Sequence, residues 1–65
     1  MPPFRVEYYC PRQAPYWQRF GTGLFSPQGK AFPSFDLAAA QANALIWQYH
    51  SARVIDVYGN VQYQV

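Results

Sequence analysis

The run of residues 35 to about 50 contains neither proline nor glycine and is rich in alanine, the residue with the highest helix propensity. Ser34 stands just before it, where a hydroxyl can cap the first backbone N–H groups of a helix. Asp36 lies in the first turn and His50 at the far end, and both positions suit the helix dipole. These residues predict a single helix around which the rest of the chain must be arranged.

Short segments with alternating polarity flank this helix and predict strands. Residues 4–9 and 16–20 precede it, and the short connection between them favours an antiparallel pair. Residues 53–57 and 61–65 follow it as a hairpin. The order predicts an α+β fold of the type ββαββ, with a small antiparallel sheet and one helix packed on one face. Residues 1–65 are expected to form one small domain.

Two details of the sheet have alternatives. A turn at residues 26–29 fits the type I pattern, and a short extra hairpin that pairs residues 24–25 with 31–32 is an optional addition to the fold. In the last hairpin, a two-residue turn at Gly59 and Asn60 would place Asp56 on the core face. A loop of residues 58–60, with Asn60 left-handed, would instead pair Ile55 with Tyr63 and leave Asp56 in water. We favour the second arrangement.

Disulfide bonds and structural metal ions, which often stabilise domains of this size, are not expected here. Cys10 is the single cysteine, which excludes an internal disulfide and fits a reducing compartment. Cys10 and His50 together fall short of the ligand set of a structural metal site, and we predict neither a metal nor a cofactor. No signal peptide is recognisable, and the longest apolar-rich stretch is shorter than the roughly 20 residues of a membrane span. A cytoplasmic location without membrane contact is therefore predicted.

The predicted helix carries two apolar stripes. The stripe assigned to the sheet comprises Phe35, Ala38, Ala42, Leu45 and Tyr49, with Ile46 beside them. The second stripe comprises Leu37, Ala40, Ala44 and Trp47, and we name it the helix patch. One sheet buries only one stripe, so the helix patch is predicted to bind a protein partner or a second copy of the chain. The alternative is that residues 21–32 fold back and cover it.

Nucleic-acid binding is the alternative function. Arg5, Tyr9, Trp17 and Arg19 are expected on the first two strands, where they could share the face away from the helix and stack single-stranded bases. The five basic residues are spread along the chain and the net charge is only +2, so they form no basic stripe.

Catalysis is not expected, because the chemical inventory is small. The chain has three carboxylates and one histidine. A nucleophilic pair of Cys10 and His50 would lack a group to orient the base and donors to form an oxyanion hole. We therefore predict that the protein is not an enzyme.

The order of these segments resembles that of short uncharacterised proteins from phages and bacteria. The resemblance lies in residues 4–9, a Trp-Gln-Arg strand at residues 17–19, the alanine-rich helix and the closing segment at residues 53–61. The chain departs from this pattern at residues 24–33, where the segment that leads into the helix is longer than usual. The resemblance implies a small accessory protein, encoded by a phage and acting on a host protein. An inhibitor of a bacterial defence complex is a further alternative that the small size suggests.

Overall fold

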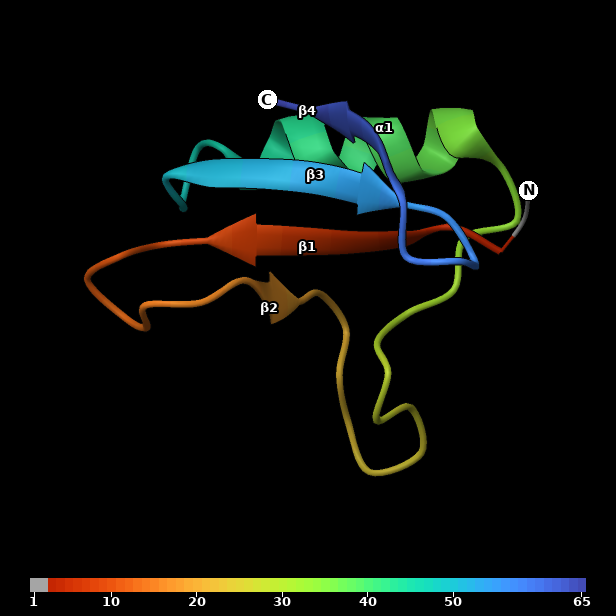
Figure 1. Cartoon of the computed structure of the whole chain (residues 1–65), viewed down its shortest axis with the longest axis horizontal. Helices are drawn as coiled ribbons and strands as arrows, with labels where there is room; N and C mark the ends of the chain where they lie inside the picture. Colours follow the sequence, from red (N-terminus) through yellow and green to blue (C-terminus); the bar gives the residue numbers. More distant parts are fainter. Residues whose placement is uncertain (1–2) are drawn as a thin grey trace.

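A computed structural model describes residues 3–65 as a four-stranded antiparallel sheet with one helix across one face (Figure 1). The strands lie in the order β2-β1-β3-β4, so that β1 and β3 are central. This arrangement confirms the predicted α+β fold of ββαββ type. The elements are β1 (Arg5–Tyr9), β2 (Gln18–Arg19), α1 (Phe35–Leu45), β3 (Ser51–Ile55) and β4 (Val61–Gln64).

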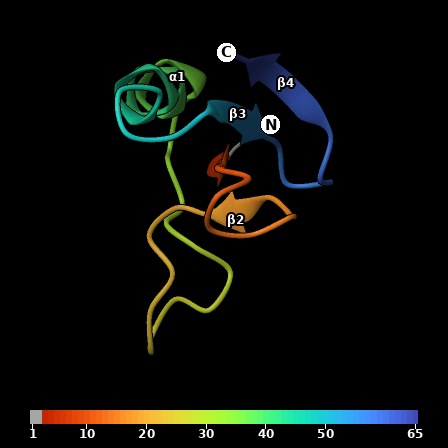
Figure 2. The same ribbon diagram turned by 90° about the vertical axis from the view of Figure 1, so that its left-hand side faces the viewer.

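The core lies between α1 and the two central strands (Figure 2). Val6 of β1 pairs with Val54 of β3, and both side chains are fully buried against the helix. Ala38 and Ala42 of α1 are also fully buried, and their small side chains let the helix approach the sheet closely. The buried cluster comprises Phe4, Val6, Phe32, Ala38, Ala42, Leu45, Ala52 and Val54.

The helix begins as predicted and ends earlier. Ser34 accepts a hydrogen bond from the backbone N–H of Leu37 through its hydroxyl, so it is the N-cap. The helix stops at Leu45 and not near His50, because β3 begins at Ser51 and the chain must reverse direction in the few residues between them. Ile46 therefore does not face the sheet as predicted; it is the C-cap residue and its side chain is 41% exposed.

The second strand is shorter than predicted, and the extra hairpin does not form. Only residues 18 and 19 of the predicted strand pair with β1. Residues 24–25 do not pair with 31–32: Gly23 bridges Ser26, while Phe32 bridges Phe4 beside the sheet. The turn at residues 26–29 is confirmed, since the N–H of Gly29 donates to the carbonyl of Ser26 at 3.1 Å.

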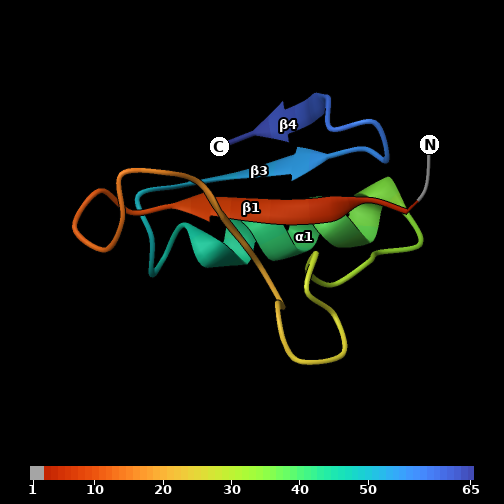
Figure 3. The same cartoon turned by 60° about the horizontal axis from the view of Figure 1, so that its bottom comes forward.

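Residues 21–31, which we name the arm, extend away from the sheet beyond β2 (Figures 1 and 3). At its base, the N–H of Lys30 donates to the carbonyl of Phe20 at 3.0 Å. Gly21 has a φ of +80°, and a Cβ there would lie 2.6 Å from the Cβ of Lys30. The two sides of the arm meet this closely only because residue 21 has no side chain.

The last hairpin also differs from the favoured prediction. Ile55 pairs with Val61, not with Tyr63, and the register shifts before Val54 pairs with Tyr63. The left-handed residue is Gly59, with a φ of +85°, and Asn60 is not left-handed. Asp56 is buried rather than exposed to water, because the loop itself supplies hydrogen-bond donors to its carboxylate.

Candidate functional site

The helix patch is exposed on the surface of the chain. Leu37 is 54% exposed and Trp47 88% exposed, and Ala40 and Ala44 are exposed as well. The arm does not cover them, since it points away from α1 (Figure 2). Because α1 ends at Leu45, Trp47 lies in the turn after the helix, where its N–H donates to the carbonyl of Ala44 at 3.3 Å.

An open hollow lies beside the first half of the helix patch. Its volume is about 430 Å³, and Leu37 and Ala40 form one wall. The base of the arm and the segment that enters α1 form the other wall, with Phe32 and Pro33. Ala44 and Trp47 do not line it. The helix patch therefore consists of a hollow at one end and a protruding indole at the other.

The tip of the arm is a second exposed apolar feature that was not predicted from the sequence. Leu24 is 90% exposed and Phe25 95% exposed, in a tight turn closed by two hydrogen bonds between Gly23 and Ser26. The available signal was Gly23 immediately before two large apolar residues, with Pro27 shortly after them. That pattern is typical of a turn and not of a strand.

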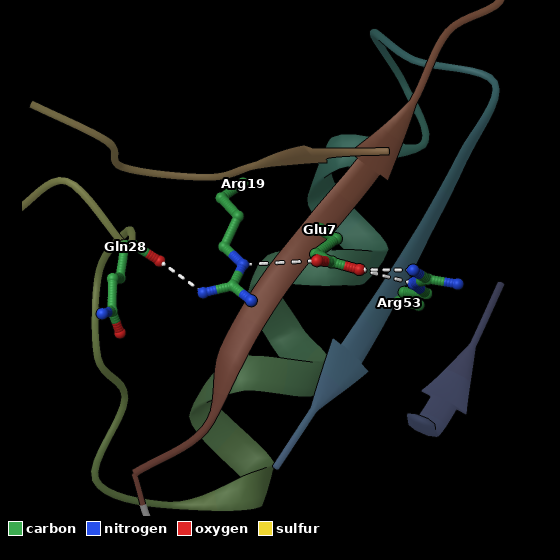
Figure 4. Close-up of polar contacts among 4 residues, drawn as sticks. All are labelled: Glu7, Arg19, Gln28 and Arg53. Atoms are coloured by element: carbon green, nitrogen blue, oxygen red, sulfur yellow. Dashed lines mark hydrogen bonds and ion pairs between the residues drawn. The ribbon is translucent and has the colours of Figure 1, made fainter. Parts of the chain in front are cut away.

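The sheet face away from α1, which we name the open face, carries a row of charges across three strands (Figure 4). The carboxylate of Glu7 on β1 lies between Arg19 of β2 and Arg53 of β3. The Nε of Arg53 donates to Oε1 of Glu7 at 2.6 Å, and the Nε of Arg19 donates to Oε2 at 3.3 Å. Arg19 also donates to the carbonyl of Gln28 in the arm at 3.1 Å. One carboxylate thus compensates two guanidinium groups.

The open face brings together part of the predicted nucleic-acid site. The rings of Tyr9 and Trp17 are 5.5 Å apart, and the guanidinium carbon of Arg53 lies 4.1 Å from the centre of the Trp17 ring. Arg53 was not among the predicted site residues. Its place follows from the pairing of β1 with β3, which sets it opposite Glu7. Arg5 lies apart from this group, beside the arm.

The residues weighed for catalysis or metal binding, Cys10 and His50, make different contacts. Cys10 has a free, half-buried thiol. His50 makes its hydrogen-bond contact with the hydroxyl of Ser51 at 3.0 Å, and its ring lies against Tyr9. Among residues 3–65, no three His, Cys, Asp or Glu side chains gather closely enough to hold a metal ion. Over the same residues, no helix has the length and apolar character needed to cross a membrane.

The fold and these surfaces define the chain as a small α+β domain in which one helix covers one face of an antiparallel sheet. Comparison with protein-family models, with curated proteins and with solved structures finds no match.

Proposed function

We propose that this chain is a non-enzymatic protein-binding module whose partner covers the helix patch. The observation that carries the proposal is the exposure of Trp47, at 88%, in a domain whose largest fully buried side chains are valines. Tryptophan is the residue most enriched at the centres of protein interfaces, because it removes a large apolar area from water when a partner covers it.

The hollow next to Leu37 supports the same proposal. It offers an apolar wall of Phe32, Pro33, Leu37 and Ala40, with Lys30 and Gln41 beside them. An apolar centre with polar groups around it is typical of protein interfaces. A projecting apolar side chain of the partner would occupy the hollow, and Trp47 would pack against the partner's surface.

Three candidate partners are proposed, each on a different ground. A second copy of the chain is one candidate, since self-association is a common way for small domains without disulfides to gain buried area. Action on a host protein as a phage-encoded factor rests on the resemblance described above. Inhibition of a bacterial defence complex rests on size alone.

Sedimentation velocity over a wide range of protein concentration tests self-association. Trp47→Ala and Leu37→Ser remove the two large side chains of the helix patch, and Tyr16→Ala is the matched control, since Tyr16 is 65% exposed and lies outside the patch. If copies of the chain pair through the patch, both patch variants shift the equilibrium toward monomer and the control does not. Self-association that survives both patch variants would contradict the proposal.

A different partner is tested with the same variants as immobilised baits. Proteins that the wild type and Tyr16→Ala retain, and that both patch variants lose, would support the proposal. If the wild type is monomeric, and both patch variants retain the same proteins as the wild type, the helix patch is not a binding surface.

Binding of single-stranded nucleic acid stays the alternative prediction, and the contact of Tyr9 with Trp17 favours it. Glu7 argues against this prediction, because its carboxylate neutralises positive charge of Arg19 and Arg53 that would otherwise attract phosphates. The guanidinium of Arg53 also occupies part of the Trp17 surface on which a base would stack. Titration with a single-stranded oligonucleotide at low salt tests it: genuine binding weakens steeply as salt is added, and absence of binding removes it.

A further inference from the structure

Arg5 is a cation that the ion pairs of the open face leave out. Both ion pairs among residues 3–65 belong to Glu7, which is engaged by Arg19 and Arg53. Arg5 stands two residues before Glu7 on the same strand and face. Its side chain makes no hydrogen bond or ion pair within the described residues, and its Nε is buried without a partner. Arg5 therefore carries a positive charge that no carboxylate among the described residues compensates.

Arg5 lines a second hollow, of about 310 Å³, between β1 and the arm. The arm contributes the rest of the wall, which consists of the apolar residues Phe25, Pro27 and Ala31, the polar residues Ser26 and Gln28, and Gly29. No acidic side chain is among the lining residues. The hollow therefore combines one uncompensated guanidinium with walls that are partly apolar and partly polar.

The hollow is held open by hydrogen bonds within the arm. The N–H of Gly29 donates to the carbonyl of Ser26, and Arg19 fastens the carbonyl of Gln28 to the sheet at 3.1 Å. Gly29 has a φ of +96°, and a Cβ there would lie 2.9 Å from the carbonyl oxygen of Phe20. The glycine lets the arm lie against the end of β2, so the walls are in place before any ligand arrives.

We propose that this hollow binds a carboxylate group that is attached to an apolar group. A guanidinium presents paired N–H donors in one plane, which match the two oxygens of a carboxylate. The single positive charge of Arg5 balances a singly charged carboxylate, whereas a phosphate dianion would keep an excess of negative charge. The exposed ring of Phe25 and the side chains of Pro27 and Ala31 receive the apolar part of the ligand. Neither Leu37 nor Trp47 lines the hollow, so this site stands independently of the proposed function.

Phenylacetate is the probe, because it joins a carboxylate to an aromatic ring. Its binding is followed through the backbone ¹H–¹⁵N signals of Phe25, Gly29 and Ala31, which line the hollow. We expect a saturable shift with a dissociation constant on the order of 1 mM. Phenylacetamide has the same shape without the charge and should cause no saturable shift. A blocked dipeptide, acetyl-Phe-Glu-amide, is titrated in parallel. If phenylacetate binds more tightly, the natural ligand is a free organic acid. If the dipeptide binds more tightly, the carboxylate comes from an acidic side chain of a protein.

Two variants and one control make the result decisive. Arg5→Gln should weaken phenylacetate binding by about tenfold or more, measured by the backbone amide signals of the arm. Arg12→Gln removes an exposed arginine outside the hollow and should leave binding unchanged. If Arg5→Gln disturbs the fold, Phe25→Ala is the second variant, because Phe25 is 95% exposed and its removal should leave the fold intact. Loss of the ring should weaken the binding of phenylacetate more than the binding of acetate.

Three results would overturn the inference. The first is the absence of any saturable shift with both phenylacetate and the dipeptide. The second is equal binding of phenylacetamide, which would show that the hollow recognises only the ring. The third is inorganic phosphate binding more tightly than phenylacetate, which would assign the hollow to a different anion.

Discussion

Asp56 illustrates how a single residue is placed by its hydrogen bonds. Its Oδ1 accepts from the backbone N–H groups of Tyr58 and Asn60, and its Oδ2 accepts from the side-chain amide of Gln62, all at 2.9 Å. The hydrogen bond from the N–H of Asn60 is the main reason that the pKa of Asp56 lies below its ordinary value, and the bonds from Tyr58 and Gln62 act in the same direction. Partial burial opposes this shift of the pKa.

Asp56→Asn should therefore change the pH dependence of stability. Because the pKa of Asp56 is lower in the folded than in the unfolded chain, its hydrogen bonds contribute stability above the unfolded pKa of about 4, and this contribution is lost as the pH falls through the folded value. The variant should melt at a lower temperature at neutral pH and lose less stability on acidification. Thermal melts between about pH 2 and pH 7 measure this. Asp36→Asn is the control, and parallel pH profiles for wild type and Asp56→Asn would contradict the prediction.

Glu7 organises the open face, since it is 8% exposed and bonded on both sides. Glu7→Gln should lower the free energy of unfolding by about 1–2 kcal/mol, because two guanidinium groups lose their charged acceptor while remaining partly solvated. Urea titration measures the loss. Combining Glu7→Gln with Arg53→Gln should cost less than the sum of the single changes, since the two residues share one interaction. Strict additivity would show that the pair contributes nothing.

Among the elements, α1 has a start that is determined locally and an end that is not. The Ser34 hydroxyl accepts from the N–H of Leu37 at 3.3 Å, and the two residues are only three positions apart in the sequence. The end at Leu45 depends on where β3 must begin in order to pair with β1. Residues 46–50 contain no proline or glycine and could continue a helix. The helix ends at Leu45 because the chain must turn there to reach the start of β3.

Ser34→Ala should destabilise the domain by about 1 kcal/mol through the loss of the N-cap. Circular dichroism during thermal or urea unfolding measures the difference. Ser26→Ala is a matched control, because Ser26 bonds through its backbone in the arm and its side chain is exposed. An equal loss from both substitutions would show that capping is not the cause.

At the scale of the whole molecule, the core is small and consists mainly of short side chains. Leu45 is one of its larger members and is 5% exposed, whereas its neighbour Ile46 is 41% exposed. Several of the largest apolar side chains, including Phe25 and Trp47, lie outside. A domain built in this way has little stability in reserve.

Leu45→Ala should cost about 2–5 kcal/mol, enough to unfold a large fraction of a domain of this size. Ile46→Ala removes a similar volume one position further and should cost far less, because that side chain is already partly in water. Urea unfolding curves for the two variants give the comparison. Similar losses would mean that the helix continues past Leu45 and buries Ile46.

The fold class and the helix start could be predicted from the sequence because they depend on local features. The alternation at Val6 and Tyr8 and the capping serine at residue 34 act over a few neighbouring residues. Two surfaces were predicted as sites. In the helix patch, Leu37 and Trp47 are exposed as predicted. In the predicted nucleic-acid site, the rings of Tyr9 and Trp17 are in contact. Whether either surface binds a partner stays a prediction.

The sequence by itself determined which segments form strands and helix, since the spacing of apolar residues, proline and glycine acts along the chain. Only the tertiary structure decided where α1 ends, that Asp56 is enclosed by its loop, and that Arg53 lies opposite Glu7 and pairs with it. Each of these depends on which residue of one strand stands opposite which residue of another. A shift of one position in that pairing reverses the face of every side chain, and short strands such as β2 carry too few residues to specify it locally.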